Sequence, residues 1–119
     1  MNQISYTNRS RFYLSQASEE LAKGDLCQAS EKGWGAAAEM VKAVAAARGW
    51  EHGGHRELFT VVDRLVAETD DENIRSQFIM AGQLHTNFYE GWLSRAAVEA
   101  TLNQVTQFVE RMESLLAGN

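Results

Sequence analysis

The chain contains no proline and one cysteine, Cys27, among its 119 residues. Without proline, nothing interrupts a long helix and no proline-rich linker divides the chain. A single cysteine excludes an intrachain disulfide, and because local spacing pairs Cys27 with no histidine, we interpret it as a packed or idle thiol. No run approaches the roughly 20 apolar residues that span a bilayer, and the polar N-terminal segment lacks the core of a signal peptide. We therefore expect a cytoplasmic protein without a membrane partner.

Basic residues are also scarce, since 11 lysines and arginines stand against 16 acidic residues and give a formal net charge of −5. A non-specific nucleic-acid binder gains most of its affinity by neutralising phosphates and usually carries a basic field. This sequence has no run of lysine or arginine. Any nucleic-acid role must therefore be local or belong to a partner, and the charge does not favour nucleic acid as a ligand.

The sequence does contain helical periodicity, with apolar residues recurring every three or four positions and no strand-like alternation. Glycines and capping residues separate the periodic segments. We expect an all-α fold, an up-and-down bundle of four to five antiparallel helices, formed by a single domain over 1–119 with residues 1–6 as a flexible tail. The predicted helices cover 26–48, 55–68, 72–89, 95–117 and a first segment that starts at residue 7 or 8 and ends at 23.

The segment 26–48 is the candidate for a central helix, because small residues dominate its predicted contact face. Gly33 and Gly35 each cost about 1 kcal/mol of helix propensity relative to alanine. Glycine inside a helix is tolerable where another helix must approach closely, and Trp34 between the two would project into a neighbouring groove. The alternative is an ordinary amphipathic helix with incidental glycines.

Arg48 and His55 are the first candidates for catalysis, with six residues between them. Arginine binds phosphate through paired donors, and histidine exchanges protons near neutral pH. Together they are the smallest set of side chains that can cleave RNA through its 2′-hydroxyl. The alternative is that Arg48 complements a helix C-terminus while His55 caps or packs in the turn.

The histidines also allow a metal hypothesis, in which His52, His55 and His85 bind zinc together with a carboxylate such as Glu51 or Glu90. However, the sequence has neither a helical HExxH motif nor the repeated Glu-x-x-His of di-iron bundles. We therefore predict no metal site and no cofactor.

A third group lies near the end of the predicted helix 72–89, where polar and aromatic residues are dense. Buried polar side chains need hydrogen-bond partners, and the predicted central helix offers two charged ones, Glu31 and Lys32. The simplest interpretation is a polar network that fixes how the helices align. A more specific interpretation is a pocket for a small ligand, lined by aromatic side chains. The candidate ligand or network residues are Glu31, Lys32, Trp34, His85, Asn87, Tyr89, Glu90 and Trp92.

Two stretches carry a resemblance to a known family: ASEKGW at residues 29–34 and LHTNFYE at residues 84–90. From about residue 14 to residue 116, the chain resembles the archaeal repeat-associated PaREP family, which is similar to the HEPN domains (higher eukaryotes and prokaryotes nucleotide-binding). The resemblance implies a four-to-five-helix bundle that is often a homodimer. It also implies one of two activities: a metal-independent ribonuclease with an arginine four to six residues before a histidine, or an inactive module that binds nucleotides or a partner such as a nucleotidyltransferase.

The residues match these implications unevenly. Arg48 and His55 fit the ribonuclease spacing, but they lie between the predicted second and third helices, whereas the HEPN motif is nearer the later helices. The positions that match the PaREP pattern are His85, Asn87, Tyr89 and Glu90. We hypothesise a non-enzymatic HEPN-like module that is dimeric and binds a small ligand, a nucleotide or a partner protein. The alternative is a metal-independent ribonuclease, related to toxin–antitoxin systems, that uses the Arg48/His55 pair.

Overall fold

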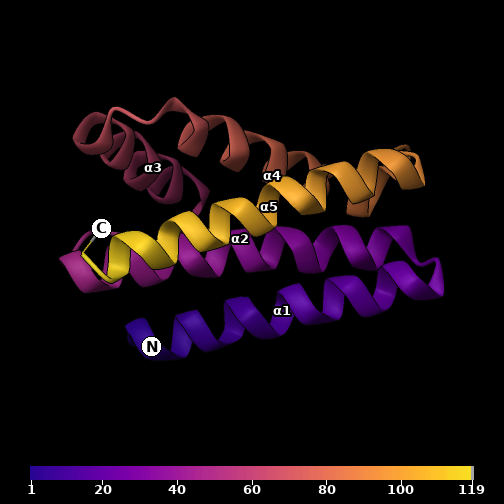
Figure 1. Cartoon of the computed structure of the whole chain (residues 1–119), viewed down its shortest axis with the longest axis horizontal. Coiled ribbons are helices and arrows are strands. Elements are labelled where there is room, and N and C mark those ends of the chain that lie inside the picture. The colour runs from indigo at the N-terminus through magenta and orange to yellow at the C-terminus, as the bar shows by residue number, and fades with distance from the viewer. Residues whose placement is uncertain (119) are drawn as a thin grey trace.

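Five α-helices and the turns between them make up the computed structural model, which describes residues 1–118 (Figure 1). No strand occurs within those residues. Four long helices alternate in direction, and the shorter α3 packs on α2 and α4. The all-α, up-and-down bundle expected from the sequence is therefore confirmed. The helices are α1 (Gln3–Lys23), α2 (Leu26–Arg48), α3 (His55–Thr69), α4 (Glu72–Glu90) and α5 (Arg95–Leu116).

The junction between α1 and α2 follows the capping chemistry that the sequence indicates. Gly24 ends α1 with a φ of 83°, a left-handed backbone conformation that residues other than glycine rarely adopt. Asp25 then caps α2, because its side chain accepts a hydrogen bond of 3.0 Å from the backbone N–H of Gln28. With two residues between them, α1 and α2 form an antiparallel hairpin.

The first helix begins earlier than the periodicity predicts. The Asn2 side chain accepts a hydrogen bond of 2.9 Å from the backbone N–H of Ser5 and caps a helix that starts at Gln3. Residues 3–6 are therefore helical, and the prediction of a tail over 1–6 is wrong for them. Tyr6 gives a physical reason, since its half-buried ring packs against the core and its hydroxyl lies 3.3 Å from Nε2 of His52.

The α2 helix is the axis of the bundle: within residues 1–118 it contacts all four other helices. A Cβ at Gly33 would lie 2.5 Å from Cδ2 of Leu102 on α5 and 2.9 Å from Cδ1 of Leu84 on α4. Gly35 faces α1, where a Cβ would lie 2.9 Å from Cδ2 of Tyr13. Because these glycines let neighbouring side chains pack directly on the backbone of α2, the central-helix interpretation is confirmed.

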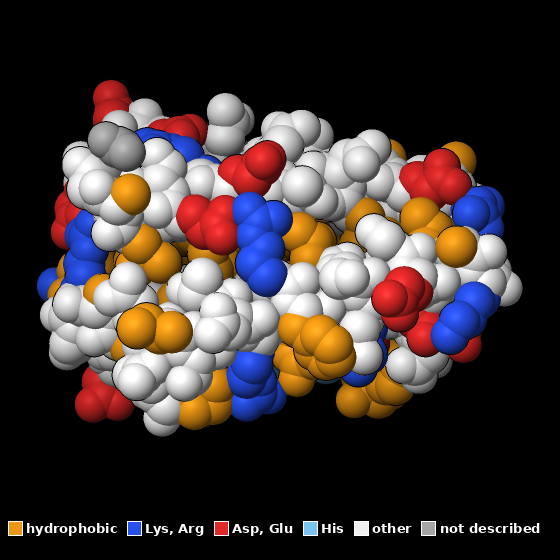
Figure 2. All heavy atoms as spheres, turned by 60° about the horizontal axis from the view of Figure 1, so that its bottom comes forward, with side chains coloured by type: hydrophobic (Ala, Val, Ile, Leu, Met, Phe, Trp, Pro, Cys, Tyr) orange, Lys and Arg blue, Asp and Glu red, His pale blue; other side chains and the backbone are white. Residues whose placement is uncertain are grey.

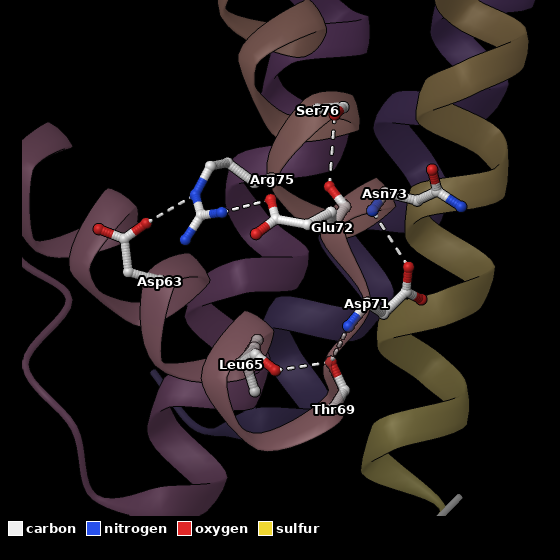
Figure 3. A network of polar contacts seen from close by, with 8 residues as sticks. All are labelled: Asp63, Leu65, Thr69, Asp71, Glu72, Asn73, Arg75 and Ser76. Carbon is white, nitrogen blue, oxygen red and sulfur yellow. Dashed lines mark hydrogen bonds and ion pairs between the residues drawn. The ribbon is translucent and has the colours of Figure 1, made fainter.

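Hydrogen bonds and ion pairs of side chains stabilise the turn between α3 and α4 (Figure 3). Asp71 accepts a hydrogen bond of 3.1 Å from the backbone N–H of Asn73 and so caps α4. Arg75 lies between Glu72, on its own helix, and Asp63, on α3. Its hydrogen bonds to Glu72 and then to Asp63 raise the pKa of the guanidinium above its ordinary value. These contacts hold α3 against α4, and both helices contribute to the candidate site.

Charges on the surface are mixed in sign. Figure 2 shows acidic and basic side chains interspersed over one face of the molecule, with apolar side chains between them. One of the ion pairs joins Arg11 of α1 to Glu113 of α5. This face offers no extended basic field to a polyanion. Within residues 1–118, no helix is both long and apolar enough to cross a membrane.

Candidate functional site

Four rings meet where α2, α3 and α4 come together, and we refer to Trp34, His55, His85 and Tyr89 as the ring cluster. The indole of Trp34 projects from α2 and is 7% exposed. It stacks on the ring of His55, with centroids 5.2 Å apart and planes 15° apart, and its centroid lies 5.4 Å from that of His85. The two imidazole centroids are 5.4 Å apart, and the Tyr89 ring meets His85 edge-on at 5.5 Å. Three helices thus bring these rings into one group.

A carboxylate orients one of the two imidazoles. Oε1 of Glu31 lies 3.2 Å from Nδ1 of His85. Because an ionised carboxylate only accepts hydrogen bonds, Nδ1 donates, and Nε2 is the ring nitrogen left to meet another molecule. Glu31 precedes Trp34 by three residues, so both side chains project from the same face of α2. The sequence placed Glu31, Trp34 and His85 in one group, and the structure brings them together.

Asn87 belongs to a buried network beside the ring cluster. Its Nδ2 donates a hydrogen bond of 2.9 Å to Oγ of Ser30, whose hydroxyl donates in turn to the carbonyl of Leu26. Its Oδ1 accepts hydrogen bonds of 2.9 and 2.8 Å from the backbone N–H groups of Trp92 and Leu93. Asn87 therefore joins α2 to the turn between α4 and α5, which is the aligning role that the simpler sequence interpretation proposed for a polar network.

The remaining candidates of this group lie at the surface or face another helix. Lys32 points toward α1, where its Nζ is 5.2 Å from the centroid of the Tyr13 ring. Tyr89 and Trp92 are 72% and 61% exposed, and Glu90 is exposed as well. Of these residues, Tyr89 is the one that belongs to the ring cluster, through its edge-on contact with His85.

Arg48 and His55 make their contacts in different places. Arg48 forms an ion pair with Glu68 of α3, and its guanidinium carbon lies 5.1 Å from the centroid of the Trp50 ring. The ring of His55, which is the first residue of α3, lies instead beside His85. The side chain that lies close to His55 is therefore that of His85, whereas Arg48 makes its contacts with Glu68 and Trp50.

His52 lies apart from the other two histidines. Its Nδ1 donates to the carbonyl of Trp50 at 2.8 Å, and the Tyr6 hydroxyl donates to its Nε2. Both of its ring nitrogens are thus engaged within the protein. The three histidines do not form one site, and within residues 1–118 no group of three or more His, Cys, Asp or Glu side chains is placed to hold a metal ion.

Sequence reasoning missed Ser30 and Phe78. Phe78 lies 5.4 Å from Trp34 and packs beneath the ring cluster, and it precedes His85 by seven residues, which is two turns of α4. Ser30 falls on the buried side of α2, where a hydroxyl needs a partner. Cys27 is half-buried, with Sγ 3.9 Å from the carbonyl oxygen of Asn87, as expected of a packed thiol.

The fold and the site define a five-helix antiparallel bundle with aromatic and imidazole rings gathered around its central helix. The model of the archaeal PaREP1/PaREP8 family matches residues 5–109, and the chain belongs to this family. A comparison with curated proteins finds no match. The bundle is also similar to the crystal structure of a protein from Sulfolobus solfataricus, with 26% identity, a TM-score of 0.82, and coverage of 91% of this chain and 96% of that chain.

Proposed function

We propose that the chain is a non-enzymatic, HEPN-like module that binds a nucleobase or nucleoside at the ring cluster. One observation carries the proposal: a largely exposed Tyr89 ring stands beside His85, and Glu31 fixes the orientation of that imidazole. The family relationship and the bundle architecture are consistent with a HEPN-like module. Buried Trp34 beneath the imidazoles supports the site, because it limits the ways in which their rings can turn.

Two kinds of contact would hold such a ligand. The face of an exposed aromatic ring stacks on any base, and such stacking contributes about 1–3 kcal/mol per base. Nε2 of a neutral His85 accepts a hydrogen bond when Nδ1 donates to Glu31, so it can receive one from a base N–H or a ribose hydroxyl. This combination requires no basic field, which agrees with the net charge of −5.

Titration with adenosine, guanosine, cytidine and uridine, followed by NMR, tests the proposal without any phosphate in the ligand. We expect Tyr89→Ala to weaken nucleoside binding by about 5- to 150-fold, since the stacking contact is lost. Trp92→Ala is the matched control, because Trp92 is also an exposed aromatic side chain but lies outside the ring cluster. If no nucleoside binds, or if both variants lose the same affinity, the ring cluster is not a nucleoside site.

A second candidate function is metal-independent cleavage of RNA. The observation that favours it is the proximity of His55 and His85, with Glu31 on Nδ1 of the second. One imidazole would remove the proton of a 2′-hydroxyl, whose oxygen attacks the phosphorus, while the other gives a proton to the departing 5′-oxygen and a 2′,3′-cyclic phosphate forms. Two histidines with a carboxylate behind one of them supply the groups that this step needs.

Cleavage of a structured RNA in the presence of EDTA distinguishes this candidate from simple binding. Activity that disappears in both His55→Ala and His85→Ala would support it. His52→Ala serves as the matched control, since that histidine is engaged with Tyr6 and Trp50. Activity that survives in both ring-cluster variants would exclude the two histidines as the acid and the base.

A further inference from the structure

A cavity of about 320 Å³ lies between the loop that follows α2 and the outer side of α3. Trp50 and Glu51 line it from the loop, while Arg56, Glu57 and Arg64 line it from α3. It shares no residue with the ring cluster. A ligand in this cavity would therefore touch none of the side chains of the ring cluster.

Trp50 holds one of the two arginines in place. The guanidinium carbon of Arg64 lies 3.9 Å from the centroid of the Trp50 ring, within range of a close cation–π contact. A guanidinium that stacks through its flat face keeps its N–H donors free in the plane, where they can form paired hydrogen bonds. The indole itself is held by Arg48, which pairs with Glu68. Trp50 thus holds the Arg64 side chain at the wall of the cavity.

The charges of the cavity distinguish it from the rest of the surface. Within residues 1–118, Arg56 and Arg64 have no carboxylate at ion-pair distance. The arginines that do have one are Arg9, Arg11, Arg48, Arg75, Arg95 and Arg111. Two arginines that pair with no carboxylate within residues 1–118 therefore line one cavity, together with Glu51 and Glu57.

We propose that this cavity binds a phosphorylated sugar. The guanidinium groups of Arg56 and Arg64 bind the phosphate, since the planar fork of arginine matches phosphate oxygens. The carboxylates of Glu51 and Glu57 accept hydrogen bonds from sugar hydroxyls. Because carboxylates repel an isolated phosphate, they favour a ligand that brings hydroxyl donors along with its charge. The volume lies at the lower end of the range for small-molecule pockets, which suits a single sugar phosphate.

Ribose 5-phosphate is the probe, and inorganic phosphate and ribose are separate arms of the same calorimetric titration of the full chain. Arg56→Gln is the principal variant, because Arg56 forms neither an ion pair nor a ring contact with any other residue of 1–118. Arg64→Gln also removes the contact with Trp50, so its circular dichroism is compared with that of the parent chain. We expect each variant to bind ribose 5-phosphate about tenfold more weakly or worse. Arg95→Gln is the control, since its side chain pairs with Glu99 on α5.

The proposal holds if ribose 5-phosphate binds more tightly than either phosphate or ribose, and if Arg56→Gln loses this affinity while Arg95→Gln keeps it. Three results would overturn it: no saturable binding of ribose 5-phosphate up to about 10 mM, equal affinity for inorganic phosphate, or the same loss in Arg95→Gln. Failure of nucleoside binding at the ring cluster leaves this test unaffected, because the probe carries no base.

Discussion

Substituting the glycines of the bundle one at a time tests whether close packing on α2 limits the fold. A Cβ at Gly33 would lie 2.5 Å from Cδ2 of Leu102 and 2.9 Å from Cδ1 of Leu84, whereas nonbonded carbons normally stay about 3.5–4 Å apart. At Gly82, in the middle of α4, no heavy atom of residues 1–118 other than those of the adjacent residues and the backbone of α4 itself lies within 4 Å of the corresponding position. Both glycines are inside helices, so the same substitution gains the same propensity at each and differs only in packing.

The expected magnitudes follow from these two terms. Replacing glycine by alanine in a helix gains up to about 1 kcal/mol of propensity, and Gly82→Ala should keep this gain. At Gly33 the overpacking costs about 1–3 kcal/mol, so Gly33→Ala should be neutral to destabilising by about 2 kcal/mol. Gly33→Leu adds further atoms to the same contact and should cost about 3 kcal/mol or more.

Thermal unfolding followed by circular dichroism measures these differences, because a chain of this length shifts its Tm by about 4 °C per kcal/mol. We therefore expect Gly82→Ala to melt about 2–4 °C above the parent chain and Gly33→Leu to melt about 12 °C or more below it. If Gly33→Ala gains as much stability as Gly82→Ala, then Leu84 and Leu102 move aside without cost. Close packing on α2 at Gly33 would then not limit the stability of the fold.

Two further predictions concern buried polar groups. Asn87→Ala should destabilise the chain by about 2–4 kcal/mol in urea unfolding at an unchanged slope, because Ser30 and two backbone N–H groups lose their partner. An unaltered midpoint would show that solvent replaces the amide without loss. Ser10→Ala should cost about 1 kcal/mol in the same assay, since its buried hydroxyl donates to the carbonyl of Ala36 at 2.7 Å. A gain in stability would contradict that assignment.

Most of the fold follows from local patterns in the sequence. The bounds of α2 depend on Asp25 as a cap and on Gly49, which closes the helix in the left-handed conformation, and both signals are local. Periodicity predicts too late a start for α1, because the first turn of this helix is stabilised by the contact of Tyr6 with His52, 46 residues away. A long-range contact leaves no trace in helical periodicity.

The candidate site was predictable where it depends on spacing along one helix. Glu31 and Trp34 are three residues apart and so share a face, whereas Lys32 is rotated by about 100° from Glu31 and faces Tyr13 on α1. The structure buries Asn87 and leaves the more apolar Phe88 beside it half-buried. Asn87 is buried because its side chain accepts hydrogen bonds from backbone N–H groups in the following turn. The sequence of the helix alone does not reveal these partners.

The partner of His55 could not be predicted from its neighbours in the chain. Spacing suggested Arg48, but the path of the loop after α2 decides where each side chain goes, and that path is fixed by contacts of Trp50 with Arg48 and Arg64. The start of α3 therefore contributes to both proposed sites, with His55 in the ring cluster and Arg56 in the cavity. Because Arg56 is exposed on the first turn of α3, it can be changed while the helices remain packed. Loss of binding in such a variant then reports on the site and not on the fold.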